Sequence, residues 1–157
     1  MAVTAHADEE LLVVFRLAGE DYGVDVARVH EINQAPQITR VPGAPPFVEG
    51  VINLRGRVIP VVDLRRRFGL PTGERTRDTR IVVAEVAGQT IGMLVDSVTE
   101  VLRIAQAQVE PPSPLVATIE SDYLRGIAKL PDRLVILLDV DRILTLSERN
   151  ALGEFAA

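Results

Sequence analysis

The sequence contains no cysteine and no tryptophan, and aromatic residues make up only 4% of its 157 residues. Without cysteine it can form no disulfide framework, thiolate nucleophile or cysteine metal site. No apolar run approaches the roughly 18 residues that a membrane helix needs, and the N-terminal residues MAVTAHADEE lack the basic flank and apolar segment of an export signal. We therefore expect a cytoplasmic protein with no direct membrane insertion.

Groups that could act as acid, base or metal ligand are also scarce. His6 lies in residues 1–9, which we expect to be a disordered tail, and His30 lies on the polar face of an expected short helix. Asp63 and Asp139 precede expected helical turns, where an aspartate usually caps the helix. No cluster has metal-ligand spacing, and no glycine pattern would cradle a phosphate. We expect no enzymatic activity, no cofactor and no metal.

What the sequence does have is an internal repeat. Residues 12–32 align without a gap over residues 81–101 at an offset of 69, and residues 47–68 align over residues 123–144 at an offset of 76. Two copies of one small fold are the first interpretation. A half of about 65 residues would bury too little apolar surface to be stable alone. The two halves should therefore pack against each other.

The copies should be mainly β, because valine, isoleucine and leucine dominate the 47% hydrophobic content. Strands are expected at 11–17, 22–24, 48–54, 58–62, 80–86, 90–94, 124–129 and 134–140. Asp25 should cap a short helix that carries Val26, Val29 and Ile32. Short strands separated by glycine and proline favour small closed barrels.

The expected strands and helix place one domain over 10–147, followed by a C-terminal helix or tail at 148–157. Within the domain, the first barrel lies roughly at 10–72 and the second roughly at 78–147. The copies differ most at one turn, where Asn53-Leu54-Arg55-Gly56 becomes Lys129-Leu130-Pro131-Asp132. Because the second copy has Pro131 where the first has Arg55, we expect Arg55 to serve a partner rather than folding.

Eight arginines gather between residues 55 and 80, opposed there by Asp63, Glu74 and Asp78. A basic barrel face could bind single-stranded nucleic acid, but this stretch lacks the aromatics on which bases stack. The formal net charge of −5 also argues against that partner. A solvated arginine face is the preferred interpretation, so no nucleic-acid partner is expected.

The most specific signal is a sequence motif. Residues 50–64, GVINLRGRVIPVVDL, resemble the signature of the CheW family, the coupling proteins of bacterial chemotaxis. Residues 22–32, 92–102 and 122–139 also resemble the family, in its order and spacing. The resemblance covers nearly the whole chain.

The resemblance implies two tandem five-stranded SH3-like barrels and a non-enzymatic adaptor. The implied partners are the regulatory domain of the histidine kinase CheA, the cytoplasmic tip of chemoreceptors (methyl-accepting chemotaxis proteins), and other CheW-like domains in arrays. The adaptor would be recruited from the cytoplasm to membrane-bound receptor clusters. A coupling protein of a pilus-motility or other chemosensory-like pathway is the alternative, and a nucleic-acid-binding barrel is a third hypothesis from another class.

The predicted partner-binding residues are Arg55, Glu31, Asn53, Val29 and Gly50. Arg55 would present several fixed donors from a tight turn. Glu31 matches the family's first helix, although Glu100 shares its place in the repeat. Asn53 could instead hold the hairpin through its own backbone, and Gly50 could answer a backbone requirement shared with Gly126.

Overall fold

The computed structural model describes residues 9–34, 37–71, 73–111 and 123–144. Apart from Glu9, the predicted tails at 1–9 and 148–157 lie outside the described residues. The strands are β1 (Glu9–Leu17), β2 (Glu20–Asp25), β3 (Val29–Gln34), β4 (Val48–Leu54), β5 (Arg57–Asp63), β6 (Arg80–Val86), β7 (Gln89–Val95), β8 (Ser97–Ala105), β9 (Val109–Glu110), β10 (Leu124–Lys129) and β11 (Leu134–Leu138).

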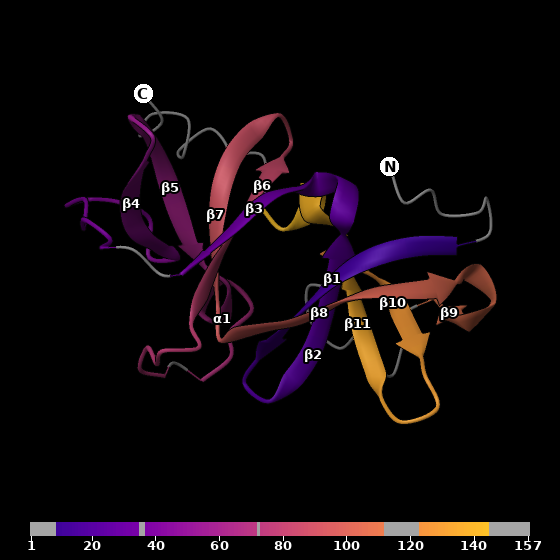
Figure 1. The fold of residues 1–157 in the computed structure, drawn as a ribbon. Helices are drawn as coiled ribbons and strands as arrows, with labels where there is room; N and C mark the ends of the chain where they lie inside the picture. The colour runs from indigo at the N-terminus through magenta and orange to yellow at the C-terminus, as the bar shows by residue number, and fades with distance from the viewer. Residues whose placement is uncertain (1–8, 35–36, 72, 112–122, 145–157) are drawn as a thin grey trace.

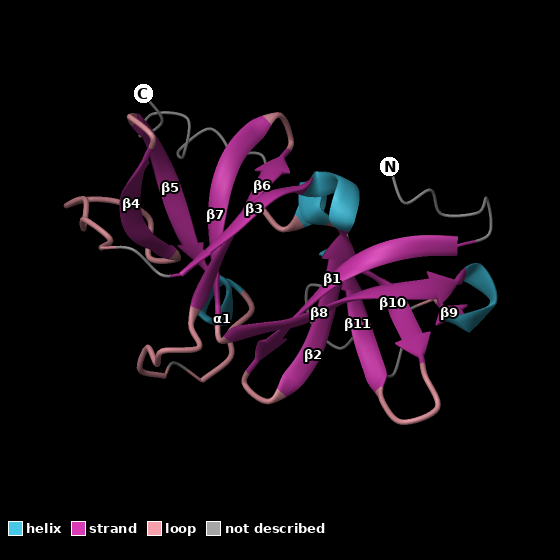
Figure 2. Cartoon of the chain, in the orientation of Figure 1, coloured by secondary structure: helices cyan, strands magenta, loops and turns pink. Residues whose placement is uncertain are grey.

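The strands form two sheets (Figure 1). One has six strands in the order β8-β1-β2-β11-β10-β9, and the other has five in the order β3-β6-β7-β5-β4. The six-stranded sheet exceeds the expected five because the two-residue β9 pairs with β10. The helical segments named in the described residues are single turns (Figure 2). Three lie between strands, namely η1 (Val26–Arg28), α1 (Leu64–Arg67) and η2 (Gln106–Gln108), and η4 (Val140–Arg142) follows β11. The predicted mainly β fold with two sheets is confirmed.

The predicted boundary between the two halves does not separate the sheets. The hairpin β1–β2 comes from the first repeat, yet β1 pairs with β8 and β2 pairs with β11 of the second repeat. Conversely, β6–β7 of the second repeat lies between β3 and β5 of the first. The division into barrels at 10–72 and 78–147 therefore differs from the observed sheets, because the two repeats exchange their first hairpins.

The exchange buries both faces of β1 and β6. Along β1, Val13, Phe15 and Leu17 belong to the largest core cluster, to which both sheets contribute. The alternate residues Leu12 and Val14 belong to a smaller cluster of the six-stranded sheet. The strand β6 divides in the same way, with Val82, Ala84 and Val86 in the largest cluster and Ile81 and Val83 in the small cluster of the five-stranded sheet. Successive side chains point to opposite faces of a strand, which explains the split.

The helix predicted after Asp25 is mostly wrong. Only Val26–Arg28 forms a 3-10 turn, capped by the Asp25 side chain, and β3 begins at Val29. In β3, Val29 lies opposite Ala84 and Ile32 opposite Val82. Branched side chains fit a strand better than a helix, so pairing with β6 outweighed the helical spacing.

The capping roles expected of Asp63 and Asp139 are confirmed. The Asp63 side chain accepts a hydrogen bond from the backbone N–H of Arg65 at 3.0 Å, which begins α1. The Asp139 side chain accepts one from the N–H of Asp141 at 3.1 Å, which begins η4. Both aspartates, which are counterparts in the repeat, therefore have the structural role of capping a helical turn.

We predict that neither half folds alone. Expressed as residues 1–75, the chain would lack the strands that separate β3 from β5, and residues 76–157 would lack β1 and β2, which lie between β8 and β11. Burying one large apolar side chain contributes about 1.5–3 kcal/mol, and each fragment would expose many. Dispersed amide spectra and a sharp thermal transition in either separate fragment would contradict this prediction, with the intact chain as control.

Candidate partner-binding site

Arg55 lies at the tip of the hairpin formed by β4 and β5. Arg55 and Gly56 have φ values of 52° and 85°, which places both turn residues in the left-handed region. The Asn53 side-chain oxygen accepts a hydrogen bond from the Gly56 backbone N–H at 2.8 Å. Asn53 therefore holds the turn in shape, as its sequence position suggested, and the turn fixes where the Arg55 side chain starts.

Arg55 and Glu31 form a bidentate ion pair. The Arg55 nitrogens Nη1 and Nη2 lie 2.6 and 2.9 Å from the two Glu31 carboxylate oxygens. The hydrogen bond from Arg55 lowers the pKa of Glu31, and the same bond raises the pKa of Arg55. Arg55 is 73% exposed and Glu31 is 23% exposed, so the guanidinium is the more accessible member. The edge strands of the five-stranded sheet are β3 and β4. The ion pair connects β3, which carries Glu31, to the turn that directly follows β4.

The other two predicted residues lie elsewhere. Val29 is partly buried and packs against the largest core cluster. Gly50 has a φ of 153°, and a Cβ atom there would lie 2.3 Å from the Thr39 carbonyl oxygen. A Cβ at Gly126, its counterpart, would lie 2.7 Å from the Glu110 carbonyl oxygen. Both glycines therefore meet a backbone requirement, and only Arg55, Glu31 and Asn53 gather at the hairpin tip.

The second sheet has an equivalent ion pair, which the comparison of the turns did not anticipate. Arg133 Nη2 lies 2.9 Å from a carboxylate oxygen of Glu100, the repeat counterpart of Glu31. Arg133 also contacts Asp21 at 3.4 Å, and Asp21 is only 8% exposed. The expectation that Arg55 serves a partner rested on its replacement by Pro131 at the aligned position, and Pro131 does not remove the ion pair from the second sheet. The second copy makes the contact from the position aligned with Arg57.

Exposed aliphatic side chains also recur at equivalent positions. The large exposed hydrophobic residues among those described are Ile32, Val58, Val101 and Leu134. Val101 follows Ile32 by the offset of 69, and Leu134 follows Val58 by the offset of 76. Each sheet thus has one exposed aliphatic residue on an edge strand and one beside the hairpin turn. The repeat alignment contained this signal, but exposure could not be read from it.

The arginine-rich stretch is largely compensated by carboxylates. Arg66 and Arg75 both contact Glu49, at 2.9 and 3.0 Å, and Arg65 contacts Asp96 at 2.5 Å.

Within the described ranges, no group of three His, Cys, Asp or Glu side chains could hold a metal ion. In the same part of the chain, no helix is long and apolar enough to cross a membrane.

Comparison with known proteins gives the family. The CheW-like domain model matches residues 11–148. The chemotaxis protein CheW of Klebsiella aerogenes is 34% identical over 92% of this chain and 87% of that protein, and the chemotaxis protein CheW of Thermotoga maritima is 37% identical over 92% and 94%. The crystal structure of the scaffolding protein TtCheW from Thermoanaerobacter tengcongensis matches with a TM-score of 0.82 and 42% identity, covering 88% of this chain and 94% of that one. This chain belongs to the CheW-like domain family.

We predict that the Arg55→Ala substitution raises the pKa of Glu31 toward its ordinary value, because the hydrogen bond that favours the carboxylate is lost. A carboxyl-detected NMR titration measures this directly. The Arg133→Ala variant is the control, since Arg133 pairs with Glu100 and should leave Glu31 unchanged. An identical Glu31 titration in the wild type and in the Arg55→Ala variant would mean that the ion pair does not form in solution.

Proposed function

We propose that this chain is a non-enzymatic adaptor that couples chemoreceptors to the histidine kinase CheA in bacterial chemotaxis. The observation that carries the proposal is the match to relatives named chemotaxis protein CheW over nearly the full length of each protein. A match of that extent concerns the whole relative rather than one module of it. The proposed site of action is the cytoplasm, at membrane-bound receptor clusters.

The geometry at Arg55 supports a role in partner binding. A guanidinium has five N–H donors in a fixed fork, and Glu31 accepts one hydrogen bond each from Nη1 and Nη2. The remaining donors suit a carboxylate or carbonyl group of a partner. Glu31 holds the fork in one orientation before the partner arrives, which reduces the entropy lost on binding.

An adaptor must hold more than one partner, and the repeat supplies two similar surfaces. Each sheet has a glutamate–arginine pair and two exposed aliphatic residues at equivalent positions. We infer that the kinase's regulatory domain and other CheW-like domains use these two ends, while the receptor tip is the further partner. Nucleic acid is disfavoured because carboxylates already pair with much of the arginine-rich stretch.

We predict that Arg55→Ala folds normally but abolishes most receptor-dependent activation of CheA. The side chain is largely exposed, so its loss should change stability by less than about 0.5 kcal/mol. Loss of an arginine from the centre of a partner interface can cost on the order of 2 kcal/mol or more. The measurements are the melting temperature and CheA autophosphorylation with and without receptor.

Two variants separate partner contact from the internal ion pair. The charge swap Glu31→Arg with Arg55→Glu preserves an ion pair but moves the guanidinium, so it should remain inactive. Arg77→Ala removes an exposed arginine of the linker and should activate normally. Normal activation by the charge swap would show that Arg55 serves only its pair with Glu31, and normal activation by Arg55→Ala would count against the site altogether.

A further inference from the structure

The described chain passes between the two sheets at two crossovers. The first is η1, which connects β2 of the six-stranded sheet to β3 of the five-stranded sheet. The second is at Asp96, which connects β7 to β8 in the opposite direction. The hairpins are exchanged at these crossovers, where the chain leaves one sheet and enters the other.

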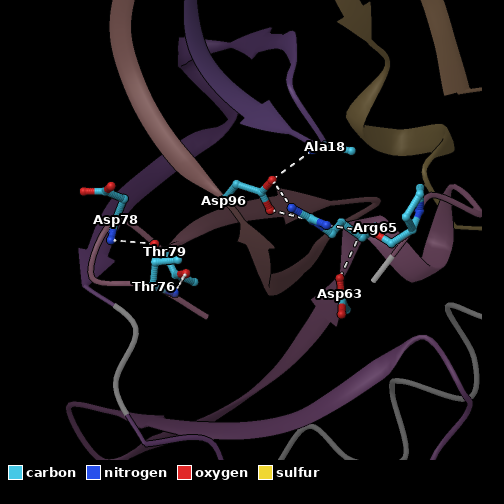
Figure 3. A network of polar contacts seen from close by, with 8 residues as sticks. Ala18, Asp63, Arg65, Thr76, Asp78, Thr79 and Asp96 are labelled. Atoms are coloured by element: carbon cyan, nitrogen blue, oxygen red, sulfur yellow. Dashed lines mark hydrogen bonds and ion pairs between the residues drawn. The ribbon is translucent and has the colours of Figure 1, made fainter. Parts of the chain in front are cut away.

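Each crossover carries a charged residue that pairs with the helical turn next to it. At the first, Arg28 forms an ion pair with Asp141 of η4. At the second, Asp96 accepts hydrogen bonds from Nε and Nη2 of Arg65 in α1, at 2.7 and 2.5 Å (Figure 3). The side chains are 22–44% exposed, so the pairs are partly shielded from water.

The same two carboxylates also connect the sheets. Asp96 accepts a hydrogen bond at 2.9 Å from the backbone N–H of Ala18, in the β1–β2 turn of the other sheet (Figure 3). Asp141 accepts one at 2.9 Å from the N–H of Ala87, in the β6–β7 turn. Ala18 and Ala87 are repeat counterparts with φ values of 50° and 49°. The two junctions are therefore built alike.

Their charges, however, are reversed. Arg65 and Asp141 are counterparts under the offset of 76, yet one is a cation and the other an anion. The crossover residues Arg28 and Asp96 lie within one position of each other in the alignment at offset 69, and they are also opposite in sign. Because both members of the pair change sign from one junction to the other, each observed junction still contains one arginine and one aspartate.

The reversal matters when the alternative pairing is considered. If each hairpin stayed with its own repeat, β2 would lie beside β5 and β7 beside β11. Arg28 would then face Arg65, and Asp96 would face Asp141. We propose that these four charges select the exchanged arrangement, because they attract in the observed pairing and repel in the direct one. The two first hairpins share the same alternation of apolar and polar positions, so that alternation does not make the choice.

Two double variants of the full chain with identical composition test the proposal. Arg65→Asp with Asp141→Arg places like charges at both observed junctions. Arg65→Asp with Asp96→Arg keeps opposite charges at both. Each variant also removes the carboxylate that accepts a hydrogen bond from one alanine, Ala87 or Ala18. The two variants therefore differ in whether the charges at each junction are like or opposite. The first should melt about 5 °C or more below the second, and it should lose the cross-strand NOEs between Tyr22 and Ile136 in part of the molecules.

A quadruple variant guards against a trivial loss of folding. Arg28→Asp, Arg65→Asp, Asp96→Arg and Asp141→Arg together restore opposite signs at both junctions while removing both alanine acceptors. It should melt above the like-charge double variant despite carrying more substitutions, and this holds also if that double variant does not fold at all. Equal melting of the two double variants, or a quadruple variant that melts below the like-charge one, would overturn the proposal.

Discussion

The exchange of the first hairpins between the two repeats is the constraint on which the rest of the structure depends. It places β1 and β6 between a small core of their own sheet and a large core that both sheets build. Four aromatic rings reinforce the shared region, with centroid separations of 6.1 Å from Phe15 to Tyr22, 6.0 Å from Tyr22 to Phe68 and 4.4 Å from Phe68 to Tyr123. Burial there raises the pKa of Tyr22. Neither sheet can be removed without opening this region.

The exchange also positions the candidate site. Glu31 lies on β3, which follows directly after the first crossover and is held by β6 of the other repeat. Arg55 reaches Glu31 from a turn that Asn53 and Gly56 fix on the far side of the same sheet. The six-stranded sheet carries a related pair, Glu100 with Arg133. Each sheet therefore has one glutamate–arginine pair between an edge strand and a hairpin.

Much of this could be predicted from the sequence, and the misses have physical causes. The runs 80–86 and 124–129 became β6 and β10 with those bounds, because alternating branched residues between turns specify strands locally. Hairpin exchange was missed because the first hairpins of the two repeats share the same alternation of apolar and polar positions, and that alternation does not specify which sheet each hairpin joins. The 25–32 helix failed because the pairing of β3 with β6 outweighed the helical spacing of Val29 and Ile32, whose branched side chains favour a strand. The family resemblance made Arg55 and Glu31 candidate partner-binding residues, but their pairing joins residues 24 apart in sequence through tertiary structure.

Native-state hydrogen exchange of the backbone amides tests most directly whether the exchanged hairpins make one unit. Amides of β1 and β6 should open with the same free energy, equal to that of global unfolding, because both strands are buried in the shared core. If the amides of β6 and β7 instead open together well below the global value while β1 and β2 stay protected, the two sheets are separate cooperative units and the account is wrong.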